Sequence, residues 1–394
     1  MMAKIPIIGS SLTFKDFCYA AKESFDSRAQ TRLTSHLTNF CLNNEIFFLD
    51  SGAACFKVIL NCLKEQSTRK EVIIPAYAPG ILVDIVLACG LKPVLCDISL
   101  DTFNYDYGSL LKCVSEKTLL VLVVHMFGIM MEGIEKLRFD LPNDVYLVED
   151  CAQAMGSSVN DKKAGSFSET SFFSFGRGKN ISICGGGFIS TRDNRLSKCI
   201  KEYIASRTQP KPVKQLAWLM KTLLVSYVVK PGVYGFLHNF TEGFKKEKLD
   251  KSLICSKFSS FQSALLSRLL SQKNIIFSSR FENGMLLLKR LQAIKELICP
   301  KINKLSQPAF NRLPFVLKNS EKLVLVREKL WEAGIESSNL YKEPLHHIFD
   351  LGYQKQDFPN AYFLAKGLLT LPIYPGLKMQ CLLKAPEVIK KYAV

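Results

Sequence analysis

Hydrophobic and polar positions alternate along the first half of the chain in a repeated strand–helix pattern. Apolar runs typical of buried strands are expected at 45–49, 71–74 and 93–97, and a helix after each of the first two. Two longer β-branched runs follow at 119–127 and 145–150, with a helix predicted at 131–139 between them, and the glycine-rich stretch 157–193 predicts further strands. This order predicts an α/β fold: a mostly parallel sheet between two layers of helices, with ligands at the carboxyl ends of the strands.

The pattern changes near residue 200. Residues 216–240 are apolar but contain lysines and a proline, the basic stretch 243–252 is a predicted linker, and 258–294 has the periodicity of a long helix. Short strands and helices alternate in the remaining tail. We therefore predict a large domain at 1–245, with an apolar insertion at about 214–245, and a smaller α+β domain at 246–394.

The amino-acid composition excludes some classes of function. An apolar fraction of 48% with 22% charged residues is ordinary for a globular protein, and the 13 cysteines include no CxxC pair. We interpret them as reduced thiols of a cytoplasmic protein and expect no metal site. The net charge of +17 favours anionic partners, but its spread along the chain and the absence of a recognition motif argue against nucleic acid.

Four candidate features fall at predicted strand ends or beside them. Lys179 lies between glycines in a strand connection, Asp150 closes a strand, Ser174 precedes the lysine by five residues, and Ser51-Gly52-Ala53 opens a helix. Each has an ordinary alternative, such as a solvated lysine or a capping aspartate. Together an amine, an acid and phosphate-binding N–H groups form the set that a pyridoxal phosphate enzyme requires.

Longer motifs identify a resemblance. The stretch "VEDCAQAMGS…KKAGSFSETSFFSFGRGKN…GGGFISTRD", with "DSGAAC", "VVHMFG" and "YKEPLHHIF", resembles the DegT/DnrJ/StrS family of sugar aminotransferases. The resemblance covers nearly the whole chain. It implies the three-layer large domain of pyridoxal phosphate fold type I with a small C-terminal domain, and the transfer of an amino group, with glutamate as the expected donor, to a nucleotide-linked keto-sugar in glycan or sugar biosynthesis.

The resemblance also implies roles for particular residues. Lys179 would bind the cofactor covalently and move the proton, and Asp150 would keep its pyridine nitrogen protonated. The other expected cofactor contacts are Ser51, Gly52, Ala53, Tyr77, Ala152, Gln153 and Ser174. Weaker substrate assignments fall on His125, Lys257 and His346. The Lys257 segment matches the piece that crosses to the neighbouring active site, which implies a homodimer.

Several positions depart from the family pattern. Ala53 replaces the usual threonine, Pro79 stands where an aromatic often stacks, and Cys255 begins the segment that usually reads Asn-x-Arg-Met. These departures leave an alternative open, in which a cofactor-binding regulatory or membrane-surface member has lost transamination. A dehydratase branch of the family has histidine in place of the lysine, so Lys179 argues against it.

The apolar segment 216–240 allows two interpretations. The first is a helical pair packed on the large domain, because runs this short are usually core. The second is an interfacial helix at the inner face of the membrane, in which Trp218 and Leu223 are near helical spacing and the lysines 245, 246 and 248 follow.

Overall fold

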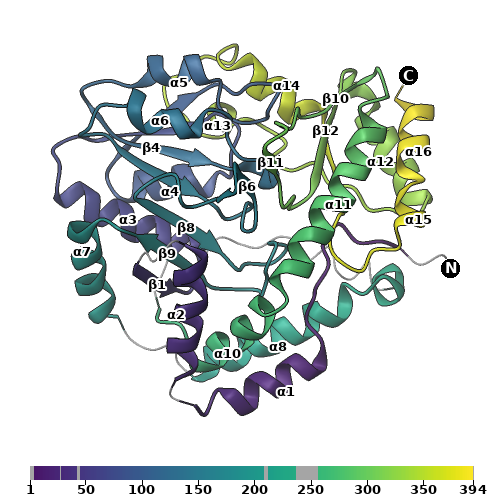
Figure 1. Ribbon diagram of the computed structural model, residues 1–394. Coiled ribbons are helices and arrows are strands. Elements are labelled where there is room, and N and C mark those ends of the chain that lie inside the picture. Colours follow the sequence, from purple (N-terminus) through teal and green to yellow (C-terminus); the bar gives the residue numbers. More distant parts are fainter. Residues whose placement is uncertain (1–3, 27, 42–44, 208–211, 237–255, 394) are drawn as a thin grey trace.

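A seven-stranded sheet forms the centre of the molecule (Figure 1). The computed structural model describes residues 4–26, 28–41, 45–207, 212–236 and 256–393. The strand order is β1-β9-β8-β5-β4-β2-β3. Their bounds are β1 Glu45–Leu49, β2 Glu71–Pro75, β3 Lys92–Cys96, β4 Thr118–Val124, β5 Tyr146–Asp150, β8 Thr170–Ser174 and β9 Gly187–Thr191. Strands β3, β2, β4, β5 and β8 pair in parallel, while β9 runs antiparallel to both of its neighbours.

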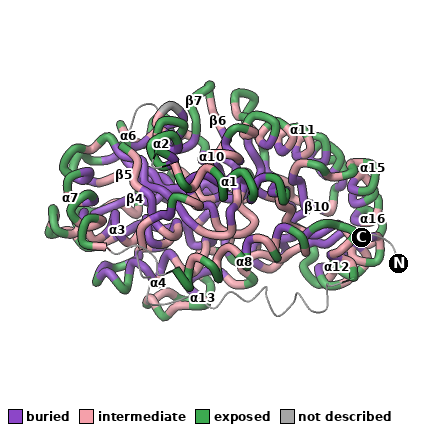
Figure 2. The backbone as a smooth tube through the Cα atoms, turned by 90° about the horizontal axis from the view of Figure 1, so that it is seen from below, coloured by how far each residue is buried: buried purple, intermediate pink, exposed green. Residues whose placement is uncertain are grey.

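Both faces of this sheet are buried, which gives the three layers that the sequence pattern predicts. All seven residues of β4 are buried, and its alternate side chains belong to different hydrophobic cores. Leu120 and Leu122 pack in one core, and Val121 and Val123 in the other. The buried backbone around β4 and β5 contrasts with the exposed outer helices in Figure 2. The mostly parallel sheet is therefore confirmed.

Helices connect the parallel strands and cover the sheet. They are α3 Gly52–Glu65, α4 Ile81–Ala88, α5 Tyr107–Cys113, α6 Ile134–Asp140 and α7 Asn194–Ala205. Two helices that the hydrophobic pattern did not indicate, α1 Phe14–Glu23 and α2 Ala29–Phe40, precede the first strand. Short 3-10 turns lie at Met126–Gly128 and Ser320–Lys322.

The C-terminal part contains a separate three-stranded antiparallel sheet in the order β10-β12-β13. Its elements are β10 Leu297–Ile298, β12 Leu313–Leu317, β13 Leu368–Leu371, α12 Leu323–Glu332, α13 Leu345–Ile348, α14 Pro359–Gly367, α15 Met379–Leu382 and α16 Ala385–Tyr392. A third small sheet joins β11 Ser306–Gln307 to β6 Ser158–Val159 and β7 Lys162–Lys163. The domain boundary at 245/246 stays a prediction.

The long helix expected at 258–294 is two helices, α10 Ser260–Leu270 and α11 Lys273–Leu291. Helix α8 Pro212–Val228 overlaps the first half of the apolar segment, and its Trp218 ring lies 6.2 Å from the ring of Phe261 in α10, at the lower end of Figure 1. The linker 243–252, the end of the apolar segment and the lysines 245, 246 and 248 lie outside the described residues. Among the described residues, no helix is both long and apolar enough to span a membrane.

Candidate active site

Three of the predicted site residues lie at the same edge of the central sheet. Asp150 is the last residue of β5 and Ser174 the last of β8, while Tyr77 follows β2 by two residues. Because β5, β8 and β2 point the same way, their carboxyl ends meet at one edge. Lys179 enters this edge from the loop between β8 and β9.

Hydrogen bonds hold the lysine loop in place. The backbone N–H of Lys179 donates to the carbonyl oxygen of Gly176 at 3.2 Å. Next to it, the Asn180 amide donates to the carbonyl oxygen of Met155 at 3.0 Å, and the Asn311 amide donates to that of Gly178 at 2.7 Å. The loop is thus fixed from the large sheet on one side and from the C-terminal part on the other.

Lys179 and Asp150 interact electrostatically in this buried setting. Burial lowers the pKa of Lys179, and the Asp150 carboxylate opposes that shift. Burial likewise raises the pKa of Asp150, which is 5% exposed, while the Ala152 N–H at 2.9 Å and the charge of Lys179 oppose the shift. The lowered pKa increases the share of neutral amine at Lys179, which nucleophilic attack and proton abstraction both require.

The start of α3 forms the predicted phosphate turn. Ser51 is the N-cap, and its hydroxyl accepts the N–H of Ala54 at 3.0 Å. A Cβ at Gly52 would lie 2.9 Å from Cβ of Ser174, so only glycine allows the turn and Ser174 to approach this closely. Ser51 also forms a bridge with Gly186 of the triple-glycine segment. A helix N-terminus beside a serine hydroxyl is suited to bind a phosphate.

Three other expected cofactor contacts lie close to this edge. Ala152 is half-buried two residues after Asp150. Gln153 is directed to the neighbouring loop, where its side-chain oxygen accepts the N–H of Phe127 at 3.1 Å. Tyr77 is fully buried, its hydroxyl donates to the carbonyl oxygen of Leu340, and its ring lies 5.8 Å from that of Tyr341. The half-buried Ala53 follows Gly52 in the turn.

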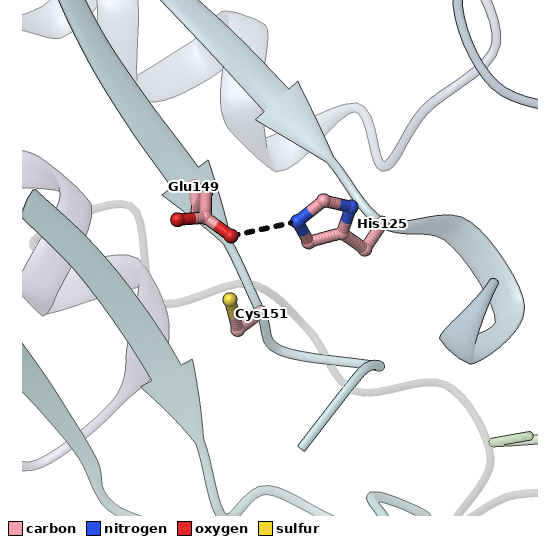
Figure 3. Close-up of side chains that lie close together, drawn as sticks. All are labelled: His125, Glu149 and Cys151. Carbon is pink, nitrogen blue, oxygen red and sulfur yellow. Dashed lines mark hydrogen bonds and ion pairs between the residues drawn. The ribbon is translucent and has the colours of Figure 1, made fainter. Parts of the chain in front are cut away.

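His125, expected to contact the substrate, belongs instead to a buried hydrogen-bonded cluster. Its Nε2 lies 3.0 Å from Glu149 (Figure 3), and its Nδ1 accepts the N–H of Met131 at 3.2 Å. Both ring nitrogens are therefore engaged, and the side chain is 0% exposed. The substrate assignment of His125 is corrected: the ring supports the ends of β4 and β5, where its backbone N–H also donates to the carbonyl oxygen of Asp150.

Ligand-type atoms of His125, Glu149 and Cys151 lie within 4.8 Å of one another (Figure 3). Glu149 already accepts hydrogen bonds from the backbone N–H groups of Gly165, Phe167 and Ser168 at 2.8–2.9 Å. Burial alone would raise the pKa of Glu149, but the hydrogen bonds from His125 and the backbone hold that pKa below its usual range. We interpret the cluster as structural.

The other two substrate candidates lie in different surroundings. Lys257 is half-buried, and the N–H of the preceding Ser256 donates to Asp50 at 3.1 Å, next to the phosphate turn of the same chain. His346 packs on Phe358, with ring centroids 5.1 Å apart, and burial lowers the pKa of its imidazole. The contacts described for His346 involve the 347–358 segment and none of the cofactor-site residues.

The sequence analysis missed two site residues from the C-terminal part. The positive charge of Arg312 lowers the pKa of Lys179, and the buried Nε of Arg312 has no hydrogen-bond partner among the described residues. Burial raises the pKa of Tyr341 to about 12. The charge of Arg312 opposes this rise, and the charge of Asp150 adds to it. Tyr341 also has a positive φ of 47°. A strained aromatic and an unpaired guanidinium nitrogen beside the lysine are features of a ligand site.

Comparison with known proteins agrees with this geometry. The profile of the DegT/DnrJ/EryC1/StrS aminotransferase family matches residues 26–385, so the chain belongs to that family. A solved sugar aminotransferase structure from Streptococcus pneumoniae superposes with a TM-score of 0.79 at 20% identity, covering 99% of this chain and 98% of that one.

Two curated relatives illustrate the range of the family. An uncharacterized protein of Methanocaldococcus jannaschii is 26% identical over 331 residues, which is 82% of this chain and 79% of that protein. A GDP-perosamine synthase of Vibrio cholerae is 35% identical over 134 residues, which is 33% of this chain and 36% of that enzyme. Membership makes this chain an aminotransferase by family, and the family cofactor is pyridoxal phosphate.

The residues present suit that cofactor. Lys179 would supply the amine, Asp150 the acid, and the Ser51 turn with Ser174 an anion site whose close packing depends on Gly52. The amine suits the aldehyde of the cofactor, the acid suits its pyridine nitrogen, and the anion site suits its phosphate.

Proposed function

We propose that the chain transfers an amino group, with glutamate as donor, to a nucleotide-linked keto-sugar in glycan or sugar biosynthesis. The observation that supports this most strongly is that the half-buried Lys179, the buried Asp150 and the Ser51 turn meet at the carboxyl edge of the sheet. The similarity to a GDP-perosamine synthase supports a nucleotide-sugar substrate.

Each residue at this edge has a chemical task in the proposal. Pyridoxal phosphate, when bound, supplies an electron-withdrawing ring that stabilises negative charge on the carbon that loses a proton. The Lys179 Nζ, whose pKa burial lowers, would take that proton and deliver it to the carbon two bonds away. The carboxylate of Asp150 holds a proton on the pyridine nitrogen, and the Ala152 N–H keeps its Oδ1 in position. Ser51 and Ser174 bind the phosphate.

The charges around the site suit anionic substrates. Arg312 lowers the pKa of Lys179, and its own pKa is lowered by burial and by the nearby Arg177. The pKa of Arg280 is lowered to about 10 by burial, with Arg312 adding to the shift. The carboxylates of Asp150 and Glu336 offset part of this positive charge, and a bound anion would offset more of it. The two carboxylates of glutamate and the diphosphate of a nucleotide sugar are such anions.

The test is a half-reaction that identifies the substrate directly. The protein loaded with the amino form of the cofactor is mixed with a panel of nucleotide keto-sugars, and return of the aldehyde-form absorbance is followed. We expect return with at least one keto-sugar, and conversion back to the amino form on adding glutamate. A wild-type protein that binds the cofactor but responds to neither the panel nor any amino acid would favour the regulatory alternative.

A homodimer completes the proposal. The segment that includes Lys257 lies beside Asp50, which directly precedes the phosphate turn. A two-fold axis near this segment would place it beside both sites at once. We expect Lys257→Glu to weaken cofactor binding at every site, and sedimentation to show a dimer. A fully active monomer would contradict this expectation.

A further inference from the structure

Helix α8 exposes a continuous apolar stripe. Val213, Leu216, Met220, Leu224 and Tyr227 are 78%, 60%, 59%, 53% and 59% exposed. Their spacing of three and four residues places all five on one face of the helix. Exposed apolar residues that occur singly are normal, but five aligned on one 17-residue helix mark an interaction surface.

The opposite face of α8 is already in use. Trp218, Leu219 and Leu223 pack against the core around β8 and β9, and the Thr222 hydroxyl donates to the carbonyl oxygen of Ile183 at 3.2 Å. Ile183 belongs to the segment that follows the lysine loop. The helix is therefore anchored by one side, and the exposed stripe is a second apolar face that the described part of the chain leaves uncovered.

Lysines of the same segment border the stripe, and Asp50 from another part of the chain lies close enough to interact with one of them, Lys214. Lys214, Lys221 and Lys230 are exposed beside it. Residues 203–241 contain no aspartate or glutamate, and the whole chain has a net charge of +17. An apolar stripe with lysines along its border is complementary to a membrane surface, which has negatively charged headgroups over an apolar interior.

We propose that α8 docks on an anionic phospholipid bilayer, with its axis in the headgroup plane and the stripe of Val213, Leu216, Met220, Leu224 and Tyr227 inserted. The helix is roughly 25 Å long, so it lies along the surface. A second copy of the chain suits the stripe less well. Two stripes packed against each other would bring the lysines of both copies together, with no acidic residue from the segment to offset them.

Vesicle flotation tests this proposal with the purified, cofactor-loaded full chain. Wild type is expected to float with vesicles of phosphatidylcholine containing about 30% phosphatidylglycerol at low salt, and to stay behind with pure phosphatidylcholine or at high salt. Leu216→Ser/Leu224→Ser should weaken binding at least tenfold. The matched control Leu305→Ser/Val324→Ser changes side chains that are 60% and 61% exposed elsewhere, and should alter binding less than twofold.

The charge requirement is tested separately. Lys214→Gln/Lys221→Gln should weaken binding about twenty-five-fold, or about fivefold for each lysine, whereas the exposed control pair Lys318→Gln/Lys378→Gln should change it far less. Wild type that fails to float at low salt would overturn the proposal, as would controls that lose as much binding as the stripe variants. Dissociation of a dimer by the leucine variant, in a protein that does not float, would assign the stripe to a second copy instead.

Discussion

Replacing Glu149 with glutamine removes one negative charge from the cluster beneath the site and keeps the shape of the side chain. Glu149 is 0% exposed and accepts five hydrogen bonds. Its Oε2 faces the His125 Nε2 and the Gly165 N–H, and its Oε1 faces two backbone N–H groups and the Ser168 hydroxyl. An amide keeps one acceptor oxygen only.

The cost follows from counting donors. Whichever way the introduced amide turns, its NH₂ group faces two N–H donors, because the Met131 N–H bond leaves the hydrogen of His125 on Nε2. Each buried N–H left without an acceptor costs about 1–3 kcal/mol. We therefore expect Glu149→Gln to lower the free energy of unfolding by about 4 kcal/mol at pH 7, or about 2 kcal/mol for each of the two donors left without an acceptor.

Urea unfolding followed by circular dichroism measures this loss, with Glu169→Gln as the control because Glu169 is exposed. The pKa of Glu149 is lowered in the folded protein, so its charge stabilises the fold above its unfolded pKa, and this stabilisation is lost as pH falls through the folded pKa. The difference between wild type and variant should therefore shrink in acid. A loss below about 1 kcal/mol at pH 7, or a difference that acid does not reduce, would refute the reasoning.

Three further predictions concern the site. Gly52→Ala should weaken cofactor binding at least tenfold in a fluorescence titration, because its Cβ would lie 2.9 Å from a neighbouring side-chain carbon, whereas Gly108→Ala, near the start of another helix with nothing closer than 3.8 Å, should not. Asp150→Asn should retain the cofactor but slow transamination by several orders of magnitude; a loss under tenfold, about 1.4 kcal/mol of barrier, would contradict its assigned role. Arg312→Gln should raise the pKa of Lys179. The rate at which the cofactor-free protein captures pyridoxal phosphate increases with pH as Lys179 loses its proton, and in the variant this increase should occur at a higher pH than in wild type. An unshifted profile would show that the two charges do not interact.

The strand–helix pattern of the first half could be predicted because it depends on local periodicity. The run that forms β4 is apolar throughout, as a strand buried on both faces must be, and Asp150 and Lys179 stand where such strands end or connect. In contrast, α2 was missed because its apolar positions are sparse and separated by polar residues, and α1 was missed because it is a single short helix with no strand before it.

The roles of residues that depend on contacts with distant parts of the chain could not be predicted from the local sequence pattern. Arg312 reaches the site from 133 positions further along the chain than Lys179, and nothing beside it in the sequence indicates a ligand. His125 was assigned to the substrate from the resemblance to the family, although its partner Glu149 is on the next strand of the sheet. Only the pairing of β4 with β5 shows that the imidazole is already engaged.

The central claim, that Lys179 holds the cofactor, can be tested by covalent trapping. The protein is incubated with pyridoxal phosphate, reduced with borohydride to make the lysine–cofactor link permanent, digested, and mapped by mass spectrometry. We predict one modified peptide, with the added mass on Lys179, and none from a Lys179→Arg variant treated in the same way. Modification of another lysine at the same yield, or an unchanged yield in the variant, would contradict the account.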